Sequence, residues 1–363
     1  MNRLHDLAES FGQSPWLDNL RRGWISSGRL QQLIDQGVRG LTSNPSIFQN
    51  AMTDTDDYDQ QLFSLVGQGK SIEASYWELV GSDITNALDL LHPVHLATNG
   101  LDGFVSVEVD PRLAADTKGT ISAARHLYRE IGRPNLYIKI PATEEGIPAI
   151  RTMIGEGCSV NVTLIFSLDR YEQVIEAYLD GLEDYQGDLS KVSSVASFFI
   201  SRTDTEVDRR LEAIGSNKSL SLRGQTAIAQ GQVAYAIFRE AFSGPRWEAL
   251  KNRGARLQRP LWASTSTKNV NYSDTLYVDA LIGPDTVNTL PDKTLKAFQE
   301  HGTLRRTVDA DLALARSILR EVEKAGVNLE EVAKVLETEG VAAFVKSFDE
   351  LLNTLDQKAS EIL

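Results

Sequence analysis

The sequence predicts an α/β fold, a (β/α)8 TIM barrel, from two observations. Short apolar segments typical of strands recur eight times along the chain, and segments with helical periodicity lie between them. This alternation favours a parallel sheet. Eight such strands favour closure into a barrel, with an open doubly wound sheet as the alternative. No linker-like change of composition divides the chain, so residues 1–363 are expected to form a single domain.

The expected strands are short apolar segments, each followed by a helical stretch: Trp16–Leu20, Val38–Ser43, Gly103–Val109, Leu136–Pro141, Val160–Ile165, Val192–Ser197, Pro260–Ser264 and Tyr277–Ile282. Residues 46–102 and 203–259 form two long connections with helical periodicity, so they are interpreted as crossovers with extra helices. A long helical region is expected from about Leu304 to Leu363.

The composition is that of an ordinary globular protein, with 42% hydrophobic and 24% charged residues. The net charge of −13 argues against nucleic acid and anionic membrane surfaces as partners. The single cysteine, Cys158, excludes an internal disulfide and fits a reducing compartment. Residues 1–17 lack a secretory signal pattern, and no stretch reaches the roughly 18 apolar residues of a membrane span. These observations predict a cytoplasmic protein that neither spans a membrane nor binds nucleic acid.

Side-chain alternation places polar groups on one face of the third to fifth strands, because neighbouring side chains of a strand point to opposite faces. The aliphatic face comprises Val105, Val107, Val109, Leu136, Ile138, Ile140, Val162, Leu164 and Phe166. The polar face comprises Ser106, Glu108, Asp110, Lys139, Asn161 and Thr163. Helices are expected to cover the aliphatic face. The polar face then points into the barrel, near the C-terminal strand ends where barrel active sites lie. Similar places on the first, second and sixth strands belong to Asp18, Thr42, Asn44 and Ser197.

Lys139 lies between two isoleucines on its strand. Burying a lysine is costly unless the amine is paired or neutralised. A neutral amine can attack a ketone and form an imine. The alternative is a structural ion pair between Lys139 and Glu108. Polar residues on the neighbouring strands favour catalysis, because Schiff-base aldol chemistry needs an amine, two acid–base groups and partners for sugar hydroxyls. Lys139, Glu108, Asp18 and the nearby Asn, Thr and Ser residues supply these groups. No metal or organic cofactor is expected, since the imine itself is the electron sink.

Several segments, in order along the chain, resemble the transaldolase family: LTSNPSIF (41–48), VSVEVDPR (105–112), YIKIPAT (137–143), NVTLIFS (161–167) and SVASFFISR (194–202), and more loosely WLDNL (16–20) and STSTKN (264–269). The resemblance implies a transferase of the pentose phosphate pathway that acts on sugar phosphates. Such an enzyme moves a dihydroxyacetone unit from sedoheptulose 7-phosphate to glyceraldehyde 3-phosphate, giving erythrose 4-phosphate and fructose 6-phosphate.

The resemblance also implies residue roles. Lys139 would form the Schiff base, Glu108 would act through a water held with Thr163, and Asp18 would be the acid–base group for carbon–carbon cleavage. Substrate hydroxyls would be held by Asn44, Thr42, Asn161 and Ser197, with Phe199 beside them. The phosphate would be bound by Arg202, Ser266 and Lys268. The alternative is that Arg202 pairs with Asp204 and that Lys268 is a solvated loop charge.

The chain departs from the family pattern at two positions. Lys268 stands where arginine is usual, which keeps the charge but loses the bidentate fork. Phe198 stands where many relatives have proline. Phe199 agrees with transaldolases, whereas the related fructose 6-phosphate aldolases have tyrosine there.

Two other functions remain as alternatives to transfer. A fructose 6-phosphate aldolase would use the same imine, and a non-catalytic barrel would only bind sugar phosphates. Retention of Lys139, Glu108 and Asp18 disfavours the second. The His92–His95 pair has no neighbouring cysteine or carboxylate ligands, so no metal site is expected. The sequence leaves open a monomer or a homodimer and the role of residues 203–259.

Overall fold

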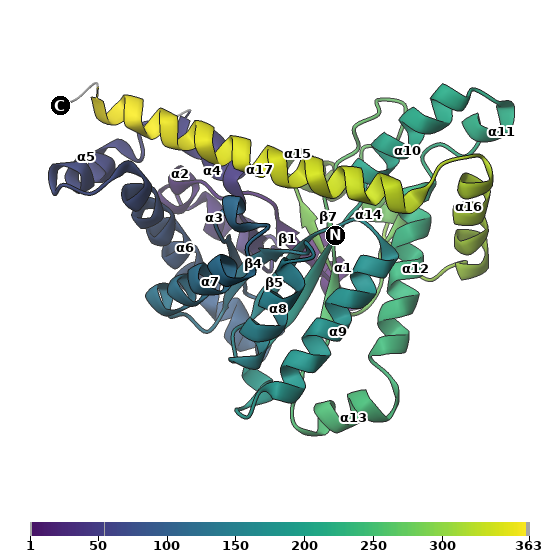
Figure 1. Ribbon diagram of the computed structural model, residues 1–363, viewed down its shortest axis with the longest axis horizontal. Coiled ribbons are helices and arrows are strands. Elements are labelled where there is room, and N and C mark those ends of the chain that lie inside the picture. Colours follow the sequence, from purple (N-terminus) through teal and green to yellow (C-terminus); the bar gives the residue numbers. More distant parts are fainter. Residues whose placement is uncertain (1, 54, 361–363) are drawn as a thin grey trace.

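A closed barrel of parallel strands forms the centre of the protein (Figure 1). The computed structural model describes residues 2–53 and 55–360. Within these residues each strand pairs with the next in the chain, and the eighth pairs with the first. The strands are β1 (Gln13–Leu17), β2 (Leu41–Thr42), β3 (Val105–Glu108), β4 (Leu136–Pro141), β5 (Val160–Ile165), β6 (Ser194–Phe199), β7 (Gln258–Ala263) and β8 (Thr286–Leu290). The predicted barrel is confirmed, and the open sheet is wrong.

Helices surround this barrel, and both long connections contain additional ones, as predicted. The helices up to β5 are α1 (Arg3–Phe11), α2 (Arg22–Ser26), α3 (Arg29–Asp35), α4 (Pro45–Thr53), α5 (Asp59–Gly67), α6 (Ile72–Ala97), the 3-10 helix η1 (Pro111–Leu113), α7 (Thr117–Ile131) and α8 (Gly146–Gly155). The later ones are α9 (Leu168–Asp184), η2 (Leu189–Lys191), α10 (Ser201–Ile214), α11 (Asn217–Leu220), α12 (Thr226–Ala241), α13 (Gly244–Asn252), α14 (Leu276–Ala280), α15 (Asp292–His301), α16 (Leu312–Lys324) and α17 (Leu329–Ser360).

The eighth strand lies later in the chain than the sequence pattern predicts. The expected segment Tyr277–Ile282 overlaps helix α14, and the strand follows it as β8. A short buried apolar run does not by itself distinguish a strand from a helix. Thr275 donates a hydrogen bond to Asp279 four residues later, at 2.9 Å, as one helical turn allows. The first strand also begins earlier than predicted, at Gln13, whereas β4 and β5 have the predicted bounds.

The strands separate two apolar layers. The outward aliphatic residues of β3 and β4, among them Val107 and Ile138, belong to the cluster that packs against the helices. The inward cluster includes Trp16, Phe104 and Tyr137, and the rings of Phe104 and Tyr137 stack at 4.1 Å between centroids. The predicted alternation on these two strands is therefore confirmed.

β5 carries a bulge that reverses the expected direction of its last side chains. Its pairing with β6 shifts register between Val162 and Ile165, and Leu164 has a left-handed φ of 59°. An extra residue in a strand breaks the alternation of faces. Leu164 and Phe166 therefore join the inward cluster beside Phe199. The prediction that they share the outward face of Val162 is wrong.

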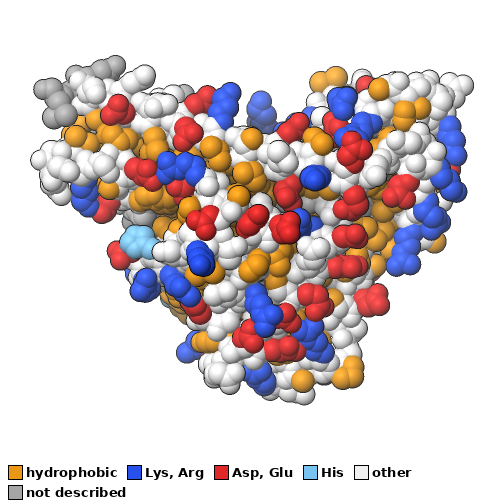
Figure 2. Space-filling view, viewed as in Figure 1, with side chains coloured by type: hydrophobic (Ala, Val, Ile, Leu, Met, Phe, Trp, Pro, Cys, Tyr) orange, Lys and Arg blue, Asp and Glu red, His pale blue; other side chains and the backbone are white. Residues whose placement is uncertain are grey.

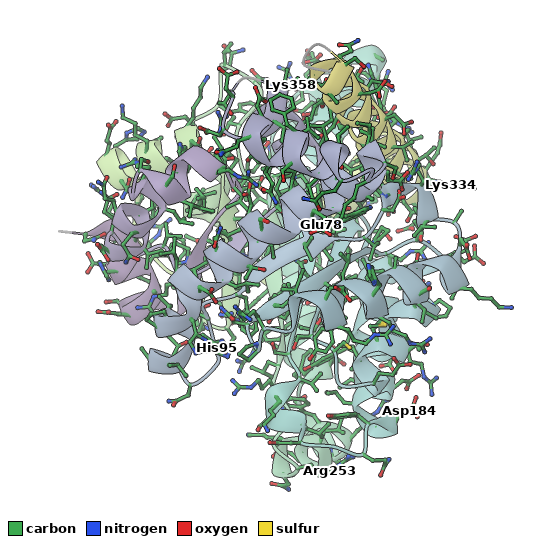
Figure 3. The ribbon with its side chains drawn as sticks, turned by 90° about the vertical axis from the view of Figure 1, so that its left-hand side faces the viewer. Glu78, His95, Asp184, Arg253, Lys334 and Lys358 are labelled. Atoms are coloured by element: carbon green, nitrogen blue, oxygen red, sulfur yellow. The ribbon has the colours of Figure 1, made fainter. Side chains whose placement is uncertain are left out.

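Helix α17 crosses over the mouth of the barrel, from α16 towards α5 (Figure 1). The hydroxyls of Ser347 on α17 and Ser46 on α4 lie 2.7 Å apart. Near the end of α17, Lys358 donates to Asp59 on α5 at 3.0 Å. In Figure 3, Lys358 lies at the top of the molecule and Arg253 at the bottom. The predicted C-terminal helical region thus corresponds to α16 and α17, beginning at Leu312; its last residues, 361–363, lie outside the described residues.

Acidic and basic side chains are interspersed over the face shown in Figure 2. Arg246 on α13 illustrates the pattern, since it pairs with Glu176, Asp180 and Glu183 of α9 at 2.7–2.8 Å. Each exposed pair of this kind contributes little to stability. Among the described residues, no helix is long and apolar enough to cross a membrane.

Candidate active site

The strand register brings a carboxylate, an amine and an amide into one row. Glu108 on β3 lies opposite Lys139 on β4, and Lys139 lies opposite Asn161 on β5. Neighbouring residues in register point to the same side of a sheet, so all three project into the barrel. The side chains of Lys139 and Glu108 are only 5% and 4% exposed.

Lys139 and Glu108 form a buried ion pair with Nζ 3.0 Å from Oε2. The contact lacks hydrogen-bond geometry, because Oε2 has no hydrogen-bond partner among the described residues. The Lys139 amine instead donates to the carbonyl oxygen of Ser43 at 3.3 Å. Burial raises the pKa of Glu108, and the Lys139 charge opposes that rise. Replacing one partner of such a pair leaves an uncompensated charge, which makes the pair sensitive to substitution.

Asp18 follows β1 directly and faces the same space. Its backbone N–H donates to Leu290 on β8 at 3.0 Å, which extends the strand ladder by one residue. Thr42 donates its hydroxyl to Asp18 Oδ1 at 3.0 Å. Burial raises the pKa of Asp18, while first Lys139 and then Thr42 lower it. The Asp18 carboxyl group therefore has a higher proton affinity than a surface aspartate.

An inner cavity of about 120 Å³ lies over the Lys139 amine. It is lined by Asp18, Thr42, Asn44, Ser46, Lys139, Thr163, Ser197, Phe199, Arg202, Leu261, Ala263, Ser264, Thr289 and Phe344. The hydroxyl of Thr163 is buried and has no hydrogen-bond partner within the described part of the chain. This polar atom is therefore available to a water or a substrate group beside the lysine.

Asn161 and Glu108 do not line the inner cavity. Asn161 is fully buried below it, where it donates to Ser106 at 3.0 Å and accepts the hydroxyl of Ser197 at 2.7 Å. Glu108 lies behind Lys139 and borders a separate, very small cavity of about 10 Å³. Asn44 lines both cavities, and its Oδ1 accepts the N–H of Ile47 at 2.9 Å.

An outer cavity of about 590 Å³ adjoins the inner one, and Asp18 lines both. Ser266 and Lys268 line the outer cavity, where Lys268 donates to Ser266 at 2.7 Å. The Lys268 side chain is exposed, but partial desolvation of its ammonium group and the neighbouring Arg202 lower its pKa. The residues predicted to bind the phosphate are thus divided, with Arg202 at the inner cavity and Ser266 and Lys268 at the outer one.

Arg202 is a partly buried cation, and its guanidinium carbon lies 5.4 Å from the centre of the Phe199 ring. The alternative that Arg202 pairs with Asp204 is wrong. Asp204 accepts hydrogen bonds from the N–H of Ala227 at 2.7 Å and the hydroxyl of Tyr277 at 3.0 Å. Desolvation is the main cause that lowers the pKa of Arg202, and the guanidinium stays charged.

Sequence reasoning missed several residues that line the inner cavity, above all Phe344 on α17. The centre of its ring lies 5.6 Å from Lys139 Nζ. Phe344 has no sequence signal, because it comes from a helix far along the chain and reads as one more apolar helix residue. Ser46 lies within the matched segment LTSNPSIF, which could have included it. No group of three or more metal-ligating side chains occurs among residues 2–53 and 55–360.

Comparison with known proteins decides the family. A sequence model described as transaldolase/fructose-6-phosphate aldolase matches residues 15–355. The chain belongs to the transaldolase/fructose-6-phosphate aldolase family.

Relatives named transaldolase cover almost the whole chain. One from Thermobifida fusca (strain YX) is 51% identical over 360 residues, which is 98% of each chain. One from Mycolicibacterium paratuberculosis is 50% identical over 347 residues, covering 94% of this chain and 93% of the relative. A third, from Mycobacterium tuberculosis, is 49% identical over the same number of residues. The chain is thus an enzyme, a transaldolase, as the resemblance predicted, and neither the aldolase nor the non-catalytic alternative is favoured.

Proposed function

We propose that this transaldolase transfers a dihydroxyacetone unit from sedoheptulose 7-phosphate to glyceraldehyde 3-phosphate through a Schiff base on Lys139. The products are erythrose 4-phosphate and fructose 6-phosphate. The observation that carries the proposal is the amine of Lys139, which is buried at a cavity of about 120 Å³ and lies 3.0 Å from a carboxylate. The single cysteine and the sugar-phosphate substrates fit an enzyme that acts in the cytoplasm. The chain is proposed to act as one domain.

The first step is formation of the imine. The Lys139 ammonium group first gives a proton to Glu108, and the neutral nitrogen then attacks the C2 carbonyl of the ketose phosphate. The C–N bond forms as the carbonyl π bond breaks, the nitrogen releases a second proton and the carbonyl oxygen takes one, which gives a carbinolamine. Loss of the C2 hydroxyl as water then gives the iminium. Glu108 and Thr163 are suited to hold a water that relays these protons, because the Thr163 hydroxyl has no other partner among the described residues. Burial raises the pKa of Glu108, which increases its affinity for the protons that are relayed.

The second step is cleavage of the C3–C4 bond. Asp18 accepts the proton of the C4 hydroxyl, the C4 oxygen forms a carbonyl, and the electrons of the C3–C4 bond move onto the iminium. The products are an enamine on Lys139 and a free aldose phosphate. Burial raises the pKa of Asp18, which increases its proton affinity. A carboxylate held by Thr42 at 3.0 Å is also fixed in orientation for the transfer.

Transfer is the reverse of cleavage with a different aldehyde. The enamine carbon attacks the aldehyde of the acceptor, and Asp18 returns its proton to the new hydroxyl. Water then releases the ketose phosphate from Lys139. Phe199 lines the cavity without a hydroxyl, so it offers no polar group that helps water or protons reach the enamine first.

The other polar residues are assigned to substrate binding. Asn44 uses its amide oxygen for Ile47, which leaves its amide N–H groups for a sugar hydroxyl. Thr42 and Ser197 line the same cavity, and Asn161 holds Ser197 in place at 2.7 Å. The phosphate is assigned to the two cations Arg202 and Lys268 with Ser266. Arg202 lines the inner cavity, and Ser266 and Lys268 line the outer one. Loops late in a barrel are a frequent phosphate position.

Trapping of the intermediate tests the proposal. Borohydride reduction in the presence of fructose 6-phosphate is expected to add a dihydroxyacetone-derived mass to the peptide that contains Lys139. Lys139→Ala is expected to abolish both trapping and turnover. Label on any other lysine, or turnover in Lys139→Ala, contradicts the assignment. Lys118→Ala, which replaces a lysine on the outer helix α7, is the control and is expected to retain trapping.

A further inference from the structure

Two buried carboxylates outside the reaction centre lie one turn apart on α10. Asp204 Oδ1 accepts the backbone N–H of Ala227 at 2.7 Å, and its Oδ2 accepts the hydroxyl of Tyr277 at 3.0 Å. Asp208 repeats the arrangement, with Oδ1 accepting the N–H of Gly224 at 2.9 Å and Oδ2 accepting the hydroxyl of Tyr272 at 2.6 Å. Each carboxylate therefore joins the start of α12 to a tyrosine between β7 and β8.

These bridges connect the two segments that carry the proposed phosphate cations. α10 begins directly after β6 and includes Arg202. The segment between β7 and α14 includes Ser266 and Lys268, and Tyr272 lies four residues after Lys268. Much of this segment is exposed, and Val270 is 95% exposed. Its internal side-chain bonds are local, such as that from Thr267 to Ser273 at 2.7 Å. Directly after β7, Ser264 is also tied to α10, because its carbonyl oxygen accepts the N–H of Ser201 at 3.0 Å. On the other side of Lys268, the bonds from the two tyrosines connect this part of the chain to α10.

The two cations repel each other when no phosphate lies between them. Arg202 lines the inner cavity, Lys268 lines the outer one, and Asp18 borders both; the Arg202 charge is also one cause of the lowered pKa of Lys268. Repulsion between like charges favours displacement of the more exposed segment, which carries Lys268. An anchor on either side of Lys268 opposes that displacement. β7 holds one side of the segment, and the tyrosines hold the other.

We propose that Asp204 and Asp208 are positioning residues that hold Lys268 at a fixed distance from Arg202 through Tyr277 and Tyr272. They act on affinity for the phosphate end of the substrate and not on the bond-forming steps. The inference rests on the assignment of Arg202 and Lys268 to the phosphate.

Tyrosine-to-phenylalanine variants isolate the hydrogen bonds from the packing. A Cβ added at Gly224 would lie 2.8 Å from Cζ of Tyr272, so the ring is tightly packed there. Phenylalanine keeps that ring and removes only the hydroxyl. Tyr277 is 2% exposed, and its ring likewise remains in place in a phenylalanine variant.

The experiment compares Tyr272→Phe, Tyr277→Phe and the double variant at pH 8, with fructose 6-phosphate and with unphosphorylated fructose as donors. We expect the KM for fructose 6-phosphate to rise about threefold in each single variant and about tenfold in the double variant, as for a loss of about 1.4 kcal/mol. The kcat and the KM for fructose are expected to stay within about twofold. A double variant that does not fold leaves the two single variants as the test.

Tyr178→Phe is the matched control, because its hydroxyl donates to Arg256 at 2.8 Å on a different part of the barrel. It is expected to change neither constant. Arg202→Ala, measured on the same two sugars, separates the two assignments. A phosphate-selective loss in Arg202→Ala without one in the tyrosine variants overturns the positioning role alone. Equal losses on both sugars in the tyrosine variants also overturn it. No selective loss in Arg202→Ala overturns the phosphate site and the positioning role together.

Discussion

Replacing Arg202 with alanine is expected to separate phosphate recognition from stability. The guanidinium is partly buried and has no ion-pair partner among the described residues, so its charge is available to a ligand. A hydrogen bond to a charged group contributes roughly 1.5–3 kcal/mol. Because each 1.4 kcal/mol is a factor of ten, loss of one such bond lowers kcat/KM for fructose 6-phosphate by about 10- to 150-fold. Activity on unphosphorylated fructose is expected to fall much less.

The same substitution is expected to have a small effect on the fold. It removes a contact with the Phe199 ring at 5.4 Å, of a kind that contributes about 0.5–1 kcal/mol. It also relieves the desolvation of an unpaired cation. The free energy of unfolding is therefore expected to change by about 1 kcal/mol or less.

Two assays together test this reasoning. Steady-state kinetics on both sugars give the selectivity, and thermal melts with inorganic phosphate give binding without turnover. Phosphate is expected to raise the Tm of the wild type and to raise that of Arg202→Ala much less, since a ligand stabilises only the state that binds it. An equal loss of activity on both sugars, accompanied by a large fall in Tm, would show that Arg202 supports the fold instead.

Other substitutions test the remaining assignments. Glu108→Gln is expected to lower the rate of imine formation by ~10²–10⁴-fold or more. Asp18→Ala is expected to permit imine formation but to lower the rate of carbon–carbon cleavage by ~10²–10⁴-fold or more. Wild-type single-turnover rates in both variants would refute the division of roles. Lys268→Arg is expected to keep or lower the KM for fructose 6-phosphate, because it adds a bidentate fork at the phosphate, and a clear rise in KM would contradict this. Asp204→Asn is expected to raise the Tm at pH 8 but change it little at pH 4, because burial raises the pKa of Asp204 from 3.8 to about 7. Between pH 3.8 and about 7 the folded state keeps a proton on Asp204 that the unfolded state releases. The free energy of unfolding therefore falls as the pH rises, by up to about 4 kcal/mol. Melting curves at the two pH values check this, and an equal shift at both would count against it.

Alternation along the strands predicted the centre of the site. The row of Glu108, Lys139 and Asn161 follows from a period of two on β3 to β5, and the structure places all three in register. The same rule failed beyond Thr163, because the bulge at Leu164 inserts a residue and reverses the faces that follow. The left-handed φ of Leu164 could not be predicted, because leucine in an apolar segment gives no sign of an unusual backbone angle.

Contacts between distant segments could not be read from the sequence. Phe344 reaches the Lys139 amine from α17, and only the path of that helix over the barrel brings it there. The short run that contains Tyr277 was predicted as a strand, since its period was too short to identify a helix turn. Its tyrosine contacts Asp204, which the sequence had offered as a partner for Arg202. Only the three-dimensional structure shows that Phe344 lies over Lys139 and that Tyr277 bonds to Asp204.

The path of α17 also has a consequence for the order in which the molecule assembles. Its bonds to α4 and α5 join residues about 300 positions apart, as in Ser46 with Ser347 and Asp59 with Lys358. Contacts of such long sequence separation form slowly, because a very large loop must close before they contribute. Apart from the closing pair of β1 with β8, each barrel strand pairs with the next strand in the chain, so most of the barrel is expected to associate first and α17 to dock last. Local opening in the native state runs the same path backwards, with α17 released ahead of the barrel. Amide exchange at the ends of α17 and in α4 would then rise together, and each such opening would briefly admit bulk water to the amine of Lys139.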